Sequence, residues 1–173
     1  MRTRPLRLLG LLCIALLILG LLITSHVQIP VANATPKDWN HNTFWHSPWG
    51  SSGVHKGIDI FGKKGTAVVA PVSGVVLLAG QLPKGGKVIA LLGPQWRVHY
   101  MAHLQSQQVG KGDWVAQGQT IGTLGDTGNA AGKAPHVHYS IVSLLPLPWK
   151  ISTQAQGWKK MFYLNPHQQL TDH

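Results

Sequence analysis

The sequence predicts an all-β domain built on an antiparallel sheet, preceded by an apolar N-terminal helix. The 173 residues include 20 Gly and 11 Pro, and only 12% are charged, a composition that suits short strands joined by tight turns. Between residues 53 and 143, no stretch keeps a helical period over three turns. Short apolar or alternating runs recur there instead, each bounded by Gly or Pro, as strands of a sheet would be.

Six of these runs are the strands that we expect, namely 66–70, 74–79, 87–92, 96–102, 119–124 and 137–142. Two longer segments, 65–76 and 112–124, resemble each other loosely, because each pairs a Gly-led turn with a short strand and a second turn. The similarity suggests two related β-hairpins and falls short of a sequence repeat.

Residues 1–34 are interpreted as a signal peptide or membrane anchor with a linker. Three arginines within residues 1–7 precede an uncharged apolar run at 8–23, the pattern of an export signal whose positive end stays in the cytoplasm. The run is slightly shorter than the roughly 20 residues of an unaided membrane span. An Ala-Asn-Ala sequence at 32–34 has the form of a cleavage site but lies far beyond the run. An uncleaved anchor is favoured over a cleaved signal, and either places the rest of the chain outside the cytoplasm.

The remainder divides into an irregular strap at 35–52, the β domain at 53–143 and a C-terminal tail at 144–173 that we expect to pack back on the sheet. The strap is rich in aromatic residues: Trp39, Phe44, Trp45 and Trp49. These side chains either line a substrate groove or only pack, and packing is the favoured interpretation.

The charge balance favours an anionic partner. Fifteen Lys and Arg face five Asp and no Glu, for a formal net charge of +10. The basic residues are scattered and no nucleic-acid-reading module is present, so no nucleic-acid partner is expected. The absence of Glu excludes the HExxH metalloproteases and leaves the ten histidines to move protons. The single Cys13 lies in the apolar run, which excludes an intrachain disulfide and a Cys-based zinc site.

Two short segments carry the chemistry. In His136-Val137-His138 the two imidazoles project from one face of a strand while Val137 turns into the core, an arrangement common among metal ligands but weak alone. Asp59 lies four residues after His55, in an apolar strand-like setting where a carboxylate is costly unless it is paired, hydrogen-bonded or metal-bound.

A further pair of histidines, His99 and His103, shares one strand face if alternation holds, and either could approach a metal. A surface position is the default expectation for each. A ligand set of His, Asp and His leaves one position of a tetrahedral zinc open, which is typical of catalytic sites. The remaining imidazoles would then act as base and as stabiliser of an oxyanion.

Three motifs in order resemble those of the lysostaphin-type, or LytM-like, peptidoglycan zinc metalloendopeptidases: HKGID at 55–59, YMAHL at 100–104 and GDTGNAAGKAPHVHYSI at 125–141. The connection at 109–125 is also similar, so the resemblance covers about residues 50–143. It implies a duplicated-hybrid-motif-like β domain, with the Gly-rich loop 125–132 bordering the cleft. The extra Lys133-Ala134 before Pro135 affects only the expected shape of that loop.

The resemblance implies a role for each of five residues. His55, Asp59 and His138 match the ligands of zinc (Zn2+). His136 matches the general base or water-orienting residue, and His103 the residue that stabilises the intermediate.

A fifth imidazole, that of His99, matches no such position, and we expect its replacement to cost little.

The implied substrate is a peptide cross-link of peptidoglycan. The motif form and the N-terminal segment are more similar to members from Gram-negative envelopes, which favours D-Ala–meso-diaminopimelate cross-links over Gly-Gly bridges. The expected location is the cell envelope, either anchored in the inner membrane facing the periplasm or secreted to the periplasm. The expected partners are peptidoglycan and, through the N-terminal segment, the membrane; whether a protein activator is needed stays open.

Two alternatives stay open. One is a non-catalytic peptidoglycan-binding or amidase-activating module of the same fold, which usually lacks metal ligands. The other is a carrier-like β domain modified at Lys84, whose flanking residues fit that role poorly.

Overall fold

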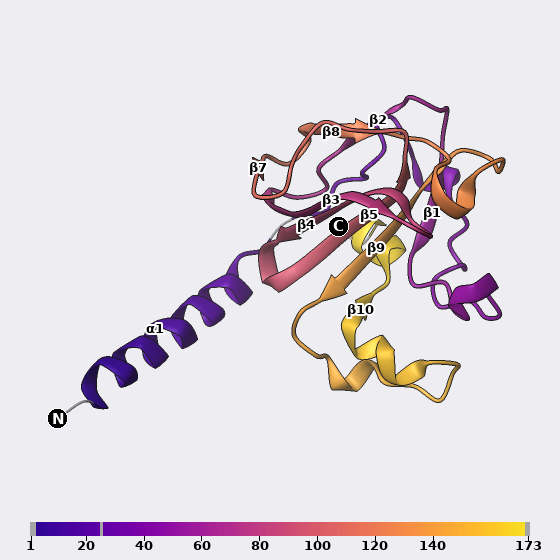
Figure 1. Ribbon diagram of the computed structural model, residues 1–173. Helices are drawn as coiled ribbons and strands as arrows, with labels where there is room; N and C mark the ends of the chain where they lie inside the picture. Colours follow the sequence, from indigo (N-terminus) through magenta and orange to yellow (C-terminus); the bar gives the residue numbers. More distant parts are fainter. Residues whose placement is uncertain (1–2, 25, 172–173) are drawn as a thin grey trace.

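The computed structural model describes residues 3–24 and 26–171, and β-strands dominate it (Figure 1). A seven-stranded antiparallel sheet has the order β1-β9-β5-β4-β3-β7, with β10 paired to β9. Its strands are β1 (Ile58–Phe61), β3 (Gly74–Leu82), β4 (Gly86–Gly93), β5 (Arg97–Leu104), β7 (Trp114–Val115), β9 (His136–Ser143) and β10 (Tyr163–Leu164). A smaller sheet of order β2-β8-β6 holds β2 (Ala67–Val69), β8 (Thr120–Thr123) and β6 (Ser106–Gln107). The predicted antiparallel β fold is confirmed, and each of the six predicted runs overlaps a strand.

The two similar segments of the sequence pair with each other. The first strand of segment 65–76, β2, pairs with the second strand of segment 112–124, β8, and β3 pairs with β7 in the same antiparallel way. The suggestion of two β-hairpins is wrong, because the two strands of each segment lie in different sheets and do not pair with each other. The loose likeness between 65–76 and 112–124 reflects this reciprocal pairing.

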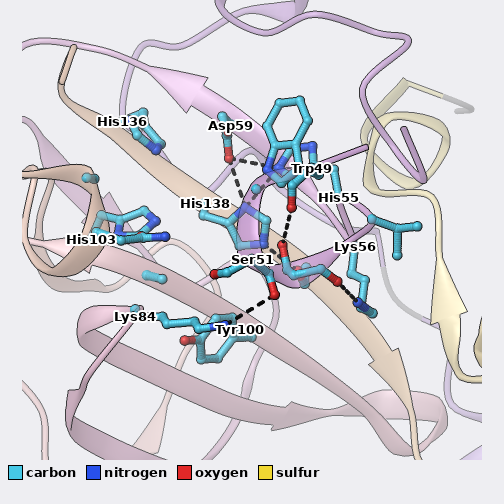
Figure 2. A pocket seen from close by; sticks show the side chains of 18 of the residues that line it. Trp49, Ser51, His55, Lys56, Asp59, Lys84, Tyr100, His103, His136 and His138 are labelled. Atoms are coloured by element: carbon cyan, nitrogen blue, oxygen red, sulfur yellow. Dashed lines mark hydrogen bonds and ion pairs between the residues drawn. The ribbon is translucent and has the colours of Figure 1, made fainter. Parts of the chain in front are cut away.

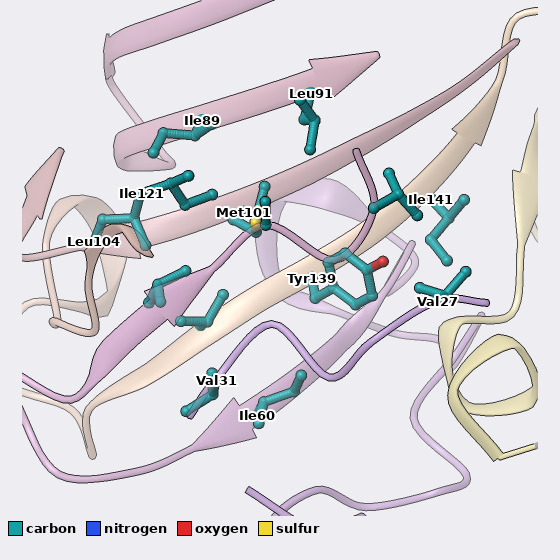
Figure 3. Packing of buried hydrophobic residues seen from close by; sticks show 14 of the residues in the cluster. Val27, Val31, Ile60, Ile89, Leu91, Met101, Leu104, Ile121, Tyr139 and Ile141 are labelled. Carbon is teal, nitrogen blue, oxygen red and sulfur yellow. The ribbon is translucent and has the colours of Figure 1, made fainter. Parts of the chain in front are cut away.

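The core lies between the two sheets. Alternate residues of β9, Val137, Tyr139 and Ile141, are fully buried and pack with apolar side chains of β4 and β5 (Figure 3). Ile121 and Leu124 close the core from the side of the small sheet. Since alternate residues of a strand point to opposite faces, the intervening residues of β9 face the other side of the large sheet.

Residues 26–34, expected to be a linker, run beside β2 as an additional extended segment. Val27 and Val31 are buried in the core (Figure 3). The backbone N–H of Val69 donates to the Pro30 carbonyl over 2.9 Å, and that of Ala32 donates to the Ala67 carbonyl over 3.0 Å. The two buried valines are four residues apart with Pro30 between them, so the sequence shows no strand-like alternation here.

The C-terminal tail packs on the large sheet. β10 extends the sheet beyond β9, and Leu164 and Leu170 are buried in the core. The other elements of the tail are η5 (Pro148–Lys150), η6 (Gly157–Phe162) and α2 (Pro166–Thr171). The strap packs through Trp39 and Trp45, both of which are buried, and includes η1 (Pro36–Asp38) and η2 (Gly50–Ser52).

An N-terminal helix, α1 (Thr3–Leu22), projects away from the domain (Figure 1). Its leucines from Leu6 onward are exposed, and the Leu17 carbonyl accepts a hydrogen bond from the Trp96 indole over 3.0 Å. Within the described ranges, no helix combines the length and apolarity that crossing a membrane requires. The membrane anchor therefore stays a prediction.

The buried valines of residues 26–34 predict that removal of this segment weakens the fold. We expect a chain of residues 26–173 to exceed a chain of residues 35–173 in free energy of unfolding by about 3 kcal/mol, because the shorter chain no longer buries Val27 and Val31. Urea denaturation of the two purified chains, both without α1, measures the difference. Equal unfolding free energies would show that residues 26–34 are dispensable and that processing at 32–34 leaves the domain intact.

Candidate functional site

A cavity of about 850 Å³ lies on the face of the large sheet opposite the core. Its floor consists of the outward-facing residues of two neighbouring strands, Val98, Tyr100 and Ala102 of β5 and His136, His138 and Ser140 of β9. Residues 49–56, 84–85 and 129–134 contribute to its walls. Every histidine to which the sequence analysis assigned a role lines this cavity.

Three of the predicted side chains converge at one end of the cavity (Figure 2). Asp59 and His138 are cross-strand partners in the β1–β9 register, and His55 lies just before β1. Asp59 Oδ1 is 2.8 Å from His138 Nδ1 and 3.1 Å from His55 Nε2, and the two ring nitrogens are 3.1 Å apart. One donor atom from each residue lies within 4.8 Å of the others, so the group could hold a metal ion.

The carboxylate of Asp59 is ionised in this setting. Burial alone would raise its pKa, but the contacts with His138 and His55 outweigh burial and hold the pKa well below its usual range. Burial lowers the pKa of His138, although Asp59 partly opposes this effect. An anionic oxygen thus lies beside the His138 imidazole, whose lowered pKa favours the neutral form that a metal ligand needs.

Hydrogen bonds on the outer side fix the rings. His55 Nδ1 is 3.1 Å from the Thr43 carbonyl, which can only accept, so Nδ1 carries the proton and Nε2 directs a lone pair at the group. His138 Nε2 is 3.0 Å from Ser140 Oγ, a hydroxyl that either donates or accepts. In the metal-free chain, one hydrogen on His138 Nδ1 therefore serves two acceptors, Asp59 Oδ1 and His55 Nε2.

This arrangement fits a tetrahedral cation such as zinc. With zinc–ligand distances of about 2.0–2.2 Å, two ligand atoms of a tetrahedron lie roughly 3.3–3.6 Å apart, so the three atoms, now 2.8–3.1 Å apart, need to separate by only a few tenths of an ångström. If His138 turns its proton to Nε2, Ser140 can accept it, and three lone pairs then face a single point. Two nitrogens and a carboxylate oxygen are ligands that zinc accepts, and three protein ligands leave a fourth position for water or substrate.

A β-bulge brings His103 into the cavity. In the β4–β5 pairing, Lys87 faces Leu104 and Ile89 faces Met101, so Ala102 and His103 together face one residue of β4. His103 takes a left-handed conformation with φ of 65°, and both bulged residues line the cavity. Bulges next to active sites commonly redirect a side chain in this way.

His103 and His136 are hydrogen-bonded in the same way, although their rings are inclined at 62° to each other with centroids 5.0 Å apart. His103 Nδ1 lies 2.8 Å from the Thr127 carbonyl, and His136 Nδ1 lies 2.7 Å from the Ala134 carbonyl. Both Nδ1 atoms must therefore donate, which leaves each Nε2 as a proton acceptor. Burial lowers the pKa of His103 to about 4, with the neighbouring imidazoles of His136 and His138 adding to the effect, so His103 is neutral at neutral pH.

The prediction that His99 and His103 share a strand face is wrong, because the bulge at Ala102–His103 reverses the alternation. His99 points into the core, is 1% exposed and lies outside the cavity lining. Its Nδ1 is 2.7 Å from the Tyr139 hydroxyl, and burial lowers its pKa to about 3. The default expectation of a surface histidine is also wrong here, and a buried hydrogen-bonded imidazole is not cheap to replace.

Trp49 stacks on the ring of His55, with centroids 4.0 Å apart and an interplanar angle of 19°. It lines the cavity, whereas Trp39 and Trp45 only pack, so the aromatic cluster of the strap divides between the two roles considered.

Ser140 was missed as a partner of His138, although its position two residues later on the same strand indicates the same face.

Comparison with known proteins identifies the family. Residues 53–145 match the family described as Peptidase family M23, which is more than half of the chain. The chain belongs to peptidase family M23.

Curated M23 relatives are longer than this chain. The Vibrio cholerae protein named peptidoglycan DD-endopeptidase ShyC is 35% identical over 97 residues, covering 56% of this chain and 22% of the relative. The Bacillus subtilis protein named L-Ala--D-Glu endopeptidase is 34% identical over 113 residues, covering 60% of this chain and 35% of the relative. The Salmonella dublin protein named murein hydrolase activator NlpD is 36% identical over 92 residues, covering 53% of this chain and 24% of the relative. The matched region spans only 22–35% of the length of these three relatives.

A solved M23 structure shows the same fold. The catalytic domain of the antimicrobial peptidase lysostaphin from Staphylococcus simulans superposes with a TM-score of 0.60 at 28% identity, covering 76% of this chain and 91% of that chain. The resemblance read from the three motifs is therefore confirmed at the level of family and fold.

The geometry predicts that His138 holds a metal and that its loss abolishes binding. We expect His138→Ala to weaken zinc affinity at least 100-fold, and Ser140→Ala to weaken it roughly 10-fold because the ring loses its outer partner. Competition with a zinc-responsive dye measures both.

The matched control deletes the core imidazole. His99→Ala should keep zinc affinity while lowering the free energy of unfolding by about 2–4 kcal/mol, because it leaves a hole and an unpaired Tyr139 hydroxyl. Unchanged zinc affinity in His138→Ala would refute the assigned ligand.

Proposed function

We propose that this M23 domain is a zinc-dependent endopeptidase that hydrolyses peptide cross-links in peptidoglycan. The observation that carries the proposal is the convergence of His55, Asp59 and His138 beside two further imidazoles whose Nε2 atoms accept protons in the same cavity. A bound zinc would lower the pKa of a water ligand and polarise the scissile carbonyl.

The imidazoles of His136 and His103 are then available to accept the proton that the water ligand releases. His136 accepts it at Nε2, and the resulting imidazolium can pass it to the leaving amine. His103 is neutral with its proton on Nδ1, so it can stabilise an oxyanion only after it too has taken up a proton at Nε2. In the proposed reaction both residues therefore act first as proton acceptors, with His136 as base and His103 as stabiliser.

The bond proposed is the D-Ala–meso-diaminopimelate cross-link. The name of the Vibrio cholerae relative, a peptidoglycan DD-endopeptidase, supports this choice, and the motif form favours it as well. The proposed location is the cell envelope, with the exposed leucines of α1 and its basic flank serving as an export signal or as an anchor facing the periplasm.

A second candidate function is activation of another wall hydrolase without catalysis, which the match to the Salmonella dublin activator favours. The retained histidine and aspartate donors argue against it, because an activator has no need of a convergent metal site. A requirement for His136, which contributes no atom to the metal group, separates the two functions.

The proposed reaction predicts that the full chain, loaded with zinc, converts cross-linked dimers of meso-diaminopimelate-type sacculi to monomers, and that a chelator stops it. His136→Ala should retain zinc yet lower turnover by a factor of about 100 or more. Mass spectrometry of the products measures the conversion.

The proposed endopeptidase function would be contradicted if wild-type protein with one bound zinc released no monomers. Stimulation of a separate amidase by both wild type and His136→Ala would then establish the activating function.

A further inference from the structure

Lysines surround the cavity, and no acid there balances them. Lys56, Lys84 and Lys133 line it, and the one carboxylate in the lining, that of Asp59, is engaged by His55 and His138. No ion pair joins any of the three lysines to a carboxylate within residues 3–24 and 26–171. The cavity mouth therefore carries uncompensated positive charge.

Two of these ammonium groups lie on either side of one loop. Lys56 Nζ donates to the Ser52 carbonyl over 3.4 Å, and Lys84 Nζ donates to the Ser51 carbonyl over 3.5 Å (Figure 2). Lys84 comes from the turn between β3 and β4, whereas Lys56 lies just before β1, so the two side chains reach the loop from segments distant in sequence. Hydrogen bonds of this length are weak, and an anion can replace them at little cost.

The two ammonium groups approach the carbonyls of neighbouring residues, Ser52 and Ser51, so two like charges lie at one loop. Like charges held together without a counter-ion are destabilising, and a ligand that brings a negative charge relieves the repulsion.

We propose that Lys56 and Lys84 bind a free carboxylate of the substrate peptide and select cross-links that carry one beside the scissile amide. This inference rests on the proposed function and names the part of the substrate that the cavity distinguishes. Meso-diaminopimelate has a second carboxylate at its cross-linked end, whereas a glycine bridge has none there. The lysine pair thus favours the first class of cross-link by charge.

The test compares two cross-linked peptides that differ only at the diaminopimelate carboxylate beside the cross-link, free in one and amidated in the other. Binding to the metal-free full chain is measured by calorimetry, so neither peptide is cleaved. We expect wild type to bind the free-acid peptide about 10-fold more tightly than the amidated peptide. Lys56→Met and Lys84→Met should each weaken binding of the free acid roughly 5-fold and leave the affinity for the amidated peptide unchanged.

Two further variants separate charge from loop structure. Lys84→Arg keeps the charge and should keep the preference for the acid. Lys111→Met removes an exposed lysine outside the cavity lining and should change neither affinity. Raising the salt concentration should weaken binding of the acid more than binding of the amide.

Three results would overturn the inference: equal binding of both peptides by wild type, no binding of either, or equal losses for acid and amide in the Lys56→Met and Lys84→Met variants. Turnover of the zinc-loaded chain is scored separately. A preference for the acid without cleavage would support carboxylate binding by the lysines and contradict the endopeptidase function. Cleavage without a preference for the acid would support the endopeptidase function and contradict carboxylate binding by the lysines.

Discussion

The site depends on one carboxylate oxygen, Asp59 Oδ1, held against two imidazole nitrogens. The β1–β9 register sets Asp59 opposite His138, and Ile58 and Ile60, both fully buried, fix which face of β1 the carboxylate occupies. A slip of one residue would turn Asp59 into the core and an isoleucine into the cavity, which the core does not permit. The apolar packing of the sheet therefore holds the three candidate metal ligands in place, and a bound cation would satisfy their converging lone pairs.

Backbone carbonyls determine how the other imidazoles act. The backbone carbonyls of Thr43, Thr127 and Ala134 accept hydrogen bonds from Nδ1 of His55, His103 and His136, respectively. Each of these three imidazoles therefore presents Nε2 to the cavity. His138 alone of the cavity histidines is held through a hydroxyl, which lets its proton change sides when Nδ1 becomes a ligand. The same cavity thus contains imidazoles suited to hold a cation and imidazoles suited to accept protons, separated by the geometry of their outer hydrogen bonds.

The alternation of side chains along strands accounts for the positions that could be predicted from the sequence. His136 and His138 on one face, Val137 in the core and Asp59 between two isoleucines all follow from period two, and the structure places them so. His103 does not follow, because the bulge inserts one residue and its left-handed backbone leaves no mark in the sequence. The backbone carbonyls that accept hydrogen bonds from these imidazoles cannot be predicted from the sequence either, because every residue type has a carbonyl. Lys84 and Ser51 meet only because two loops distant in sequence share a wall, and the buried segment 26–34 has a proline in place of an alternating pattern.

Of the four cavity imidazoles, we propose that two bind the metal and two do not. The X-ray absorption fine structure of zinc in the full chain tests this division directly, because scattering from imidazole rings counts the bound histidines. We expect two imidazoles with the remaining ligands oxygen at about 2.0–2.2 Å, and the same spectrum for His136→Ala. Three imidazoles in the wild type, or the loss of one in His136→Ala, would contradict it.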